Sequence, residues 1–545
     1  MEWLVGTWQG FADGQPFYEH WEKVNDKEYN NINFSLCTGD TVIDSRSKIE
    51  IKNKKIVYSS GQNIWELKEI DDAKMIFEND QNKETFTFSK TAGGEWNAVL
   101  KSPQATLNYT LRRTAPIGEL LNTKAEFLEG RYRGDLEFNN KKLSTSIHFF
   151  VENDRQKATA STPANLQLDQ PFNSVCYNPP FVKLTLQDGT RILQLNAKLE
   201  GDKITGKLAG EIPATLALSK QEKPIAVPET YIVEKVKIKN GDMVLDGNLF
   251  LPKGIGPFGA LIMIAGSGNH IKEEYNGWAD LLASKGVAVL IYDKRNVTNT
   301  SNLTIRQRTS DVVLPGQLEG DILAAVSLLK SRKDIRSIGL FGFSQGAVLA
   351  PIVAANNNDI SFLVAVSGNV TTDKEFIINQ SLTRLRQRNF SEAQISRANN
   401  IMERLFDYVK TKKDGGEIQR QIDKAYEEGF GQYTLPRYLP NDDEIRYLST
   451  WNSFEHDPAE FYGKINIPVY AVFGADDWVI PVERSIQILN ETYSRKQHLL
   501  TLKVYTGSDH FIKNMPPRDD FDFPKFAPNY INHLAEWIVE QSQRR

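Results

Sequence analysis

Five short, continuous apolar runs constrain what this chain can fold into more than any other feature. They cover residues 260–265, 287–292, 338–341, 362–366 and 469–473. Because the runs do not alternate with polar residues, each predicts a strand buried on both faces, as in a parallel sheet covered by helices. Stretches with helical spacing, such as 318–329, separate them. The succession predicts an open, doubly wound α/β sheet.

The N-terminal part of the sequence has a different pattern. Segments such as 49–51, 86–88 and 147–151 place apolar residues at every second position, which predicts strands with one buried face. Residues 3–10 and 127–134 share the pattern aromatic-Leu-x-Gly-x-aromatic-x-Gly, which suggests two related small barrels or sandwiches. We therefore expect an all-β domain at 1–116, a second small β domain at 117–222, and an α/β domain at 223–545.

Residues 369–464 form an insertion within the α/β region that we expect to be mostly helical. Ser391 and Gln394 have the spacing of a capping box, and Phe390 and Ile395 that of a hydrophobic staple. One face of the helix that follows is apolar, with Ile395, Ala398, Met402, Leu405 and Val409. Plain helix packing and a cap over a site both explain this face, and the two are compatible.

Residues 342–346, Gly-Phe-Ser-Gln-Gly, fit the G-x-S-x-G pattern of a nucleophile elbow. With Gly and Ser each at about 7%, the pattern arises by chance about 0.2 times in a chain of this length. The context adds to it, because an apolar strand at 337–341 enters the motif and a helix of small residues at 346–350 leaves it. Strand, elbow and helix together predict that Ser344 is a nucleophile.

A serine hydroxyl needs a base to take its proton, and in this arrangement the acid and then the histidine follow the serine along the chain. His510 follows the predicted strand 499–505 through a short loop, which places it at the carboxyl edge of the sheet. His533 lies in a terminal helix, His498 precedes the strand, and His456 is a weaker rival in a loop. We predict that His510 is the base.

The acid is expected after the preceding strand, 469–473. Asp476 and Asp477 both stand there, and either one could instead be a helix cap or a turn residue.

Backbone N–H groups that stabilise a developing oxyanion should come from two places. One is Gln345, directly after the nucleophile. The other is the loop 266–270, Gly-Ser-Gly-Asn-His, where Ser267 is our choice. The loop has no G-x-x-x-x-G-K or G-x-G-x-x-G phosphate-binding pattern. Polar loop residue and substrate contact are alternatives for the histidine, and the candidate substrate-contacting residues are Gly266, Gly268 and His270.

Composition limits the partners. The length of 545 residues suggests about three domains. The net charge is −4 without a long basic stretch, so we expect no nucleic acid. No apolar run approaches the roughly 20 residues of a membrane helix. No ligand cluster with metal spacing occurs, so we predict no metal and no cofactor. Cys37 and Cys176 lie in different segments, which argues against a disulfide framework.

No signal peptide is visible, because residues 3–10 already have the pattern of a folded domain. We expect a periplasmic or secreted location if a leader has been trimmed, and a cytoplasmic one otherwise. The oligomeric state is not addressed by these patterns.

Residues 231–545 resemble a bacterial α/β-hydrolase group near the acyl-CoA thioesterase/BAAT C-terminal domains, the dienelactone hydrolases and the prolyl-oligopeptidase-like enzymes. The matching pieces are 251–258, 266–268, 292–295, 342–346, 474–481 and His510. In such families the acid stands three residues after the glycine of the 474–481 segment, which implies Asp477. Residues 296–298 depart from the usual Gly-x-Gly, and neither cysteine lies in this region, which argues against the cysteine chemistry of dienelactone hydrolases.

Residues 1–115 resemble an uncharacterised bacterial lipocalin-like β-barrel domain, through 3–10, Glu19, Trp21 and 109–113. Residues and resemblance together predict a serine hydrolase that cleaves a small-molecule ester or acylated substrate through an acyl-enzyme, with Ser344, His510 and Asp477 as the triad. A peptidase or acyl-CoA thioesterase with the same triad is one alternative. A catalytically silent ligand-binding protein is another.

Overall fold

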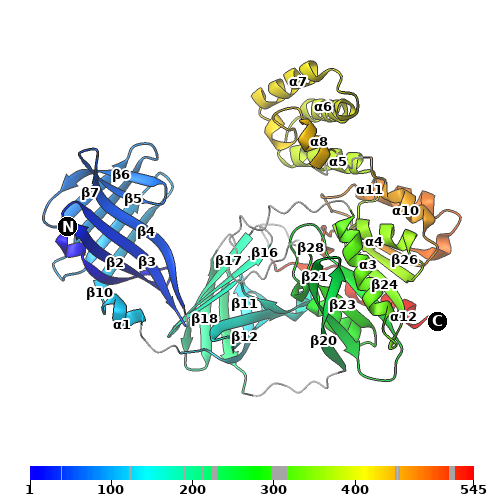
Figure 1. Cartoon of the computed structure of the whole chain (residues 1–545), viewed down its shortest axis with the longest axis horizontal. Helices are drawn as coiled ribbons and strands as arrows, with labels where there is room; N and C mark the ends of the chain where they lie inside the picture. The colour runs from blue at the N-terminus through cyan, green and yellow to red at the C-terminus, as the bar shows by residue number, and fades with distance from the viewer. Residues whose placement is uncertain are drawn as a thin grey trace. The chain divides into compact units, whose positions relative to one another are not determined.

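A computed structural model describes residues 1–38, 40–121, 126–188, 191–209, 213–222, 230–295, 316–447, 451, 455–514 and 522–544. The chain forms two compact units, Met1–Pro163 with Asp169–Ile225, and Ala164–Leu168 with Ala226–Arg545 (Figure 1). In the described part of the chain, no helix is long and apolar enough to cross a membrane.

The first unit begins with a closed barrel of ten strands, in which each strand is bonded to its sequence neighbour and β1 closes onto β10. A short 3-10 helix, Glu2–Leu4, precedes β1, so the first strand starts later than residue 3. Aromatic side chains such as Trp8, Trp21 and Trp96 fill its core. The strands are Gly6–Ala12, Gln15–Asn25, Glu28–Cys37, Asp40–Lys52, Lys55–Ser60, Asn63–Ile70, Lys74–Asn79, Glu84–Lys90, Trp96–Lys101 and Thr106–Arg113.

A short helix, α1 (Ile117–Leu121), separates the barrel from a nine-stranded sheet in the order β14-β13-β12-β11-β19-β18-β17-β16-β15. Gly6 opens β1 and Gly130 opens β11, both with positive φ (131° and 118°), so the two similar octapeptides start the first strand of each sheet in the same way. Strands β11 to β19 are Gly130–Phe138, Lys141–Glu152, Arg155–Thr162, Gln167–Pro171, Ser174–Asn178, Phe181–Asp188, Arg191–Glu200, Lys203–Ala209 and Thr215–Lys220.

Cys37, at the end of β3, and Cys176, in β15, form a disulfide. The argument from their separate segments against disulfide bonding is therefore wrong. They are 139 residues apart in sequence, but the barrel and the second sheet belong to one compact unit. Gln15 also donates from Nε2 to the backbone oxygen of Ala197 at 3.0 Å, which is a second link between the two sheets.

The second unit contains an eight-stranded sheet in the order β20-β21-β23-β22-β24-β25-β26-β27, parallel from β23 onwards. The α/β sheet predicted from the apolar runs is confirmed. Its strands are Tyr231–Asn240, Met243–Pro252, Phe258–Ile264 (β22), Ala288–Tyr292 (β23), Ile335–Phe343, Ile360–Val366, Val469–Gly474 and Leu500–Tyr505. Two more short strands, β28 (Lys513–Asn514) and β29 (Lys525–Phe526), pair with each other.

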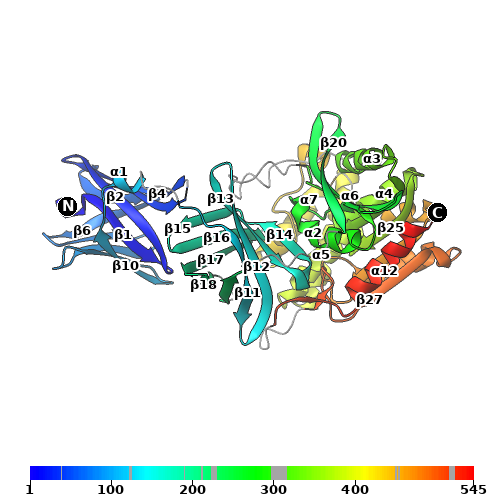
Figure 2. The same ribbon diagram turned by 90° about the horizontal axis from the view of Figure 1, so that it is seen from below.

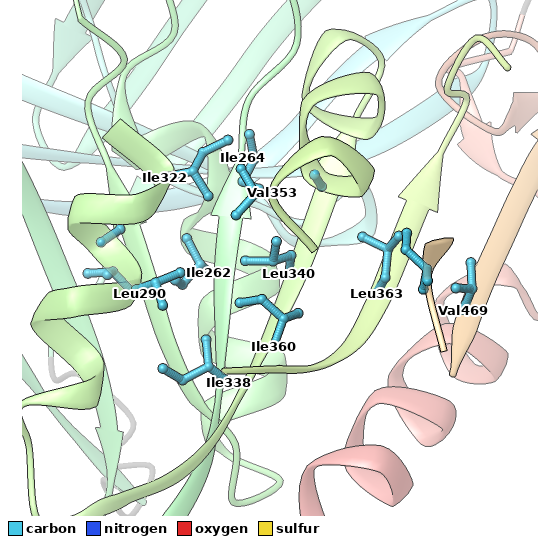
Figure 3. Packing of buried hydrophobic residues seen from close by; sticks show 14 of the residues in the cluster. Ile262, Ile264, Leu290, Ile322, Ile338, Leu340, Val353, Ile360, Leu363 and Val469 are labelled. Carbon is cyan, nitrogen blue, oxygen red and sulfur yellow. The ribbon is translucent and has the colours of Figure 1, made fainter. Parts of the chain in front are cut away.

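Both faces of the central strands of this sheet are buried, which explains the continuous apolar runs. Ile262, Ile264 and Leu290 pack on one face with α3 and α4 (Figure 3), whereas their sequence neighbours Leu261 and Met263 pack on the other face with α2 and α12. Figure 2 shows α12 and the α3–α4 pair with strands of the sheet between them. The covering helices are α2 (Asn276–Ala283), α3 (Gln317–Lys330), α4 (Gln345–Asn356), α11 (Val482–Thr492) and α12 (Tyr530–Gln543).

Helices fill the insertion between β25 and β26, as predicted, and they have an apolar cluster of their own. Ser391 caps α6, where its Oγ accepts from the N–H of Gln394 and its own N–H donates to Oε1 of Gln394. The predicted apolar face from Ile395 to Val409 is buried. The helices are α5 (Asp373–Gln387), α6 (Glu392–Thr411), α7 (Gly415–Glu427), α8 (Asp442–Tyr447) and α10 (Pro458–Lys464).

Candidate active site

Ser344 occupies a sharp turn between β24 and α4, with φ 52° and ψ −115°, a conformation that non-glycine residues rarely adopt. Its N–H donates to the backbone oxygen of Val366 at 2.9 Å, which ties the turn to the neighbouring strand. The two flanking glycines are required by space. A Cβ on Gly346 would lie 2.3 Å from the backbone oxygen of Ile264, and one on Gly342 would lie 2.2 Å from that of Gly346.

His510 lies next to Ser344, with 2.9 Å between its Nε2 and Ser344 Oγ. It follows β27 through the loop 506–510, which packs tightly against the end of β26. A Cβ on Gly474 would lie 2.1 Å from the backbone oxygen of Asp509, so this close approach also requires glycine. The loop is fixed further by the N–H of Asp476, which donates to the backbone oxygen of Ser508 at 2.9 Å.

Asp477 contacts the other side of the imidazole, with 2.7 Å between its Oδ2 and His510 Nδ1. Its Oδ1 accepts from the backbone N–H of Val479 at 2.8 Å, so both carboxylate oxygens are held. The Asp477 side chain is fully buried, whereas Asp476 is exposed. Of the two acids that the residues left open, the one in contact with His510 is therefore Asp477.

The other histidines that follow the elbow lie in different surroundings. His456 faces Asp373, with 3.6 Å between Nδ1 and Oδ2. His533 on α12 contacts the hydroxyl of Tyr505 at 3.1 Å, and His498 lies in a short 3-10 helix before β27. Within the described ranges, no three His, Cys, Asp or Glu side chains gather closely enough to hold a metal ion.

The glycine loop after β22 lies beside the serine. A Cβ on Gly266 would sit 3.4 Å from the Cβ of Ser344, in ordinary contact. Ser267 is exposed, and Gly268 has φ 96°, which favours glycine. The other predicted donor is the backbone N–H of Gln345, which is the first residue of α4. The helix itself therefore supplies no acceptor for this N–H.

His270 binds within its own loop through both ring nitrogens. Nε2 lies 2.8 Å from the backbone oxygen of Ser267, and Nδ1 lies 2.6 Å from Oε2 of Glu274. Burial alone would lower the pKa of His270, but the hydrogen bond and charge of Glu274 raise it above its usual value. Two acceptors suit the doubly protonated ring, so His270 holds the loop, which is the simpler of the two interpretations.

The sequence patterns do not indicate Lys294 as a site residue, although residues 292–295 are one of the segments that resemble the related hydrolases. Its Nζ donates to the backbone oxygen of Gly266 at 2.5 Å and to Oε1 of Gln345 at 2.7 Å. One side chain thus joins the two segments that carry the predicted oxyanion donors. Burial lowers the pKa of Lys294 to about 8. No pattern in the sequence indicates this contact, because one partner lies in the loop after β22 and the other at the start of α4, far from Lys294 in sequence.

Aromatic rings surround the His510 side of the site. Phe343 stacks on Phe511 with 5.4 Å between ring centroids and lies equally far from the ring of His510. Phe511 is 55% exposed, and Trp478, next to Asp477, is 45% exposed. Large exposed apolar side chains beside a polar cluster are typical of a binding surface for an apolar group.

Sequence comparison agrees with this fold. Residues 259–513 match the model of a family described as alpha/beta hydrolase fold. The chain is also 25% identical over 351 residues to the esterase EstD of Thermotoga maritima, an alignment that covers 62% of this chain and 74% of that relative.

Solved structures with a similar arrangement include an esterase of Pyrococcus furiosus and a dienelactone hydrolase of Anabaena variabilis. The first is 15% identical and has a TM-score of 0.33, and the match covers 59% of this chain and 93% of the esterase chain. The second is 16% identical and has a TM-score of 0.32, and the match covers 57% of this chain and 97% of the dienelactone hydrolase chain.

Proposed function

We propose that this protein is a serine hydrolase that cleaves small carboxylic esters, on the basis of the α/β-hydrolase fold of its C-terminal unit, in which residues 259–513 match the family model. The observation that carries the proposal is the continuous contact from Ser344 Oγ through the His510 ring to the buried Asp477. A nucleophile, a base and an orienting carboxylate in this order are what acyl transfer requires.

In the first step, His510 Nε2 takes the proton of Ser344 as its Oγ attacks the ester carbonyl. Asp477 accepts from Nδ1–H, so the ring keeps the tautomer that leaves Nε2 free to act as a base. The N–H groups of Gln345 and Ser267 stabilise the negative charge that develops on the carbonyl oxygen. His510 then gives the proton to the leaving alcohol, and the acyl group remains on Ser344.

In the second step, His510 takes a proton from water, which attacks the acyl-enzyme. The tetrahedral intermediate collapses, the carboxylic acid leaves, and the proton returns to Ser344. Together the two steps consume one ester and one water and release one alcohol and one carboxylic acid, and neither step as written uses a metal or cofactor.

The substrate class rests on two observations. The similarity to EstD, which is named an esterase, favours an ester leaving group. The exposed rings of Phe511 and Trp478 favour an apolar acyl or alcohol group. Fold and triad alone do not choose between leaving groups, since esterases, thioesterases and peptidases use the same chemistry.

A matched set of substrates tests the proposal: p-nitrophenyl butyrate, butyryl-CoA and an aminoacyl p-nitroanilide. We expect kcat/KM for the ester to exceed the other two at least a hundredfold. A preference for the thioester or the anilide would replace the esterase by a thioesterase or a peptidase. Absence of turnover of all three would favour the silent binding protein.

A further inference from the structure

The N-terminal barrel contains a cavity of about 390 Å³ that is unrelated to the serine site. The size is within the range of pockets for small organic ligands, roughly 300–1,000 Å³. Aromatic rings of several barrel strands line it, namely Phe17, Tyr58, Phe86 and Tyr109. Cys176 and Phe181 of the second sheet also line it, and the Cys37–Cys176 disulfide links that sheet to the end of β3.

A carboxylate lies in the wall beside these rings. Glu19 shares the inner face of β2 with Phe17 and Trp21, and its Oε2 accepts from Trp21 Nε1 at 2.8 Å. Among the described residues, no lysine or arginine forms an ion pair with it. An indole N–H needs only one acceptor, whereas a carboxylate can accept about four hydrogen bonds. The anchoring of Trp21 therefore leaves most of the capacity of Glu19 unused.

The surroundings of Glu19 favour a positive partner. Four charged side chains line the cavity, and three of them are acids: Glu19 and the exposed Asp13 and Asp44, against Lys183. Burial raises the pKa of Glu19 to about 7, which is the cost of ionising a carboxylate without a cation beside it.

A second acceptor lies on the next strand. Asn33 on β3 pairs with Glu19 and lines the cavity, and Asn31, two residues away on the same face, pairs with Trp21. Asn31 is 6% exposed, and its Nδ2 donates to Ser47. Its Oδ1 has no hydrogen-bond partner among the described residues. Within the described ranges, Asn31 Oδ1 is therefore a free acceptor in the barrel core, which also contains the unpartnered indole N–H groups of Trp65 and Trp96.

We propose that this cavity is a binding site for a small organic cation, with an apolar body among the aromatic rings and a protonated amine at Glu19. The volume fits a small organic molecule, the aromatic rings fit its apolar body, and the excess of acids fits its charged amine. The site belongs to the first unit and does not depend on the proposed ester hydrolysis.

Three indole compounds that differ only in the end of the side chain test the proposal with the full-length protein: tryptamine, tryptophol and indole-3-acetate. Isothermal titration calorimetry at pH 8 should show one tryptamine bound per chain, tryptophol bound at least tenfold more weakly, and no binding of indole-3-acetate. Equal affinities for tryptamine and tryptophol, or no binding of tryptamine, would overturn the proposal.

Two variants locate the site. Glu19→Gln keeps an acceptor for Trp21 and should remove the preference for tryptamine over tryptophol, whereas Glu22→Gln, an exposed position on the same strand, should keep it. Leu100→Trp, which fills the cavity without touching the charge, should abolish tryptamine binding. Circular dichroism confirms folding of each variant. A Glu19→Gln protein that still prefers tryptamine would refute the role of the carboxylate.

Discussion

The contact between His510 and Asp477 distinguishes two neighbouring carboxylates that look alike in the sequence. Replacing Asp477 by Asn should lower kcat for p-nitrophenyl butyrate about 10⁴-fold, because the ring loses its orienting acceptor and adopts the wrong tautomer. The matched change Asp476→Asn, at an exposed side chain, should leave kcat within twofold. Similar losses in the two variants would contradict the assigned role of Asp477.

Lys294 gives a pH-dependent prediction at the same scale. With a pKa of about 8, it loses its charge as pH rises through that value, and the link between Gly266 and Gln345 weakens. We expect kcat/KM to fall above pH 8, and this alkaline limb to disappear in Lys294→Arg, which stays charged. Because folding lowers the pKa of Lys294, the charged ammonium destabilises the folded state below pH 8. The free energy of unfolding should therefore rise between pH 8 and about pH 10, while kcat/KM falls over the same range. A flat activity profile from pH 7 to 9.5 would refute the prediction.

Local patterns identified Ser344 and His510 as site residues and left Asp476 and Asp477 as candidates for the acid, because each follows a predicted strand and the carboxyl ends of parallel strands meet at one edge. The choice of Asp477 came from the resemblance to related hydrolases. The contact geometry agrees with that expectation, while the catalytic roles stay predictions. Lys294 could not be found in this way, since its partners are a backbone oxygen in the loop after β22 and a side chain at the start of α4. Residues 296–298, which depart from the related families, lie outside the described residues.

The junction between β24 and α4 is the element on which the site depends. An alanine at Gly346 would place its Cβ against the backbone oxygens of Ile264 and Ala265, neither of which can move alone. We expect Gly346→Ala to reduce the unfolding free energy of the α/β unit by about 1–3 kcal/mol and to abolish turnover. Gly416→Ala in α7, where an added Cβ meets nothing within 4 Å, should be neutral or stabilising. Urea unfolding of both variants measures the difference.

Elements with a clear apolar pattern, continuous or alternating, were the predictable ones. The apolar runs at 260–265 and 469–473 became β22 and β26 because a strand buried on both faces needs no polar positions. The alternation in the N-terminal half predicted the strands and their buried faces, but it did not predict which strands pair with each other. It therefore could not distinguish a barrel from a sandwich. Strand pairing is decided by contacts between distant residues, and the same reason hid the pairing of Cys37 with Cys176.

On the scale of the whole molecule, the disulfide closes a large loop within the first unit, whereas the serine site belongs to the second unit. Replacing both cysteines by serine should destabilise the first unit by about 2–5 kcal/mol, as expected for long loops. Differential scanning calorimetry should show the transition of the first unit lowered and that of the second unit unchanged, with full ester turnover. A parallel loss of both transitions would contradict this separation.

The disulfide also bears on where the protein works. Such bonds persist in oxidising compartments, which favours the periplasmic or secreted alternative over the cytoplasmic one. We propose this location on that ground alone.

The most direct test of the account is covalent labelling of the nucleophile. A fluorophosphonate probe reacts with a serine only when a base activates it. Mass spectrometry of the digested protein should place one label on Ser344, and Ser344→Ala should lose both the label and p-nitrophenyl butyrate turnover, while Ser267→Ala keeps the label. An unlabelled wild-type protein, or a Ser344→Ala variant with full turnover, would contradict the central claim.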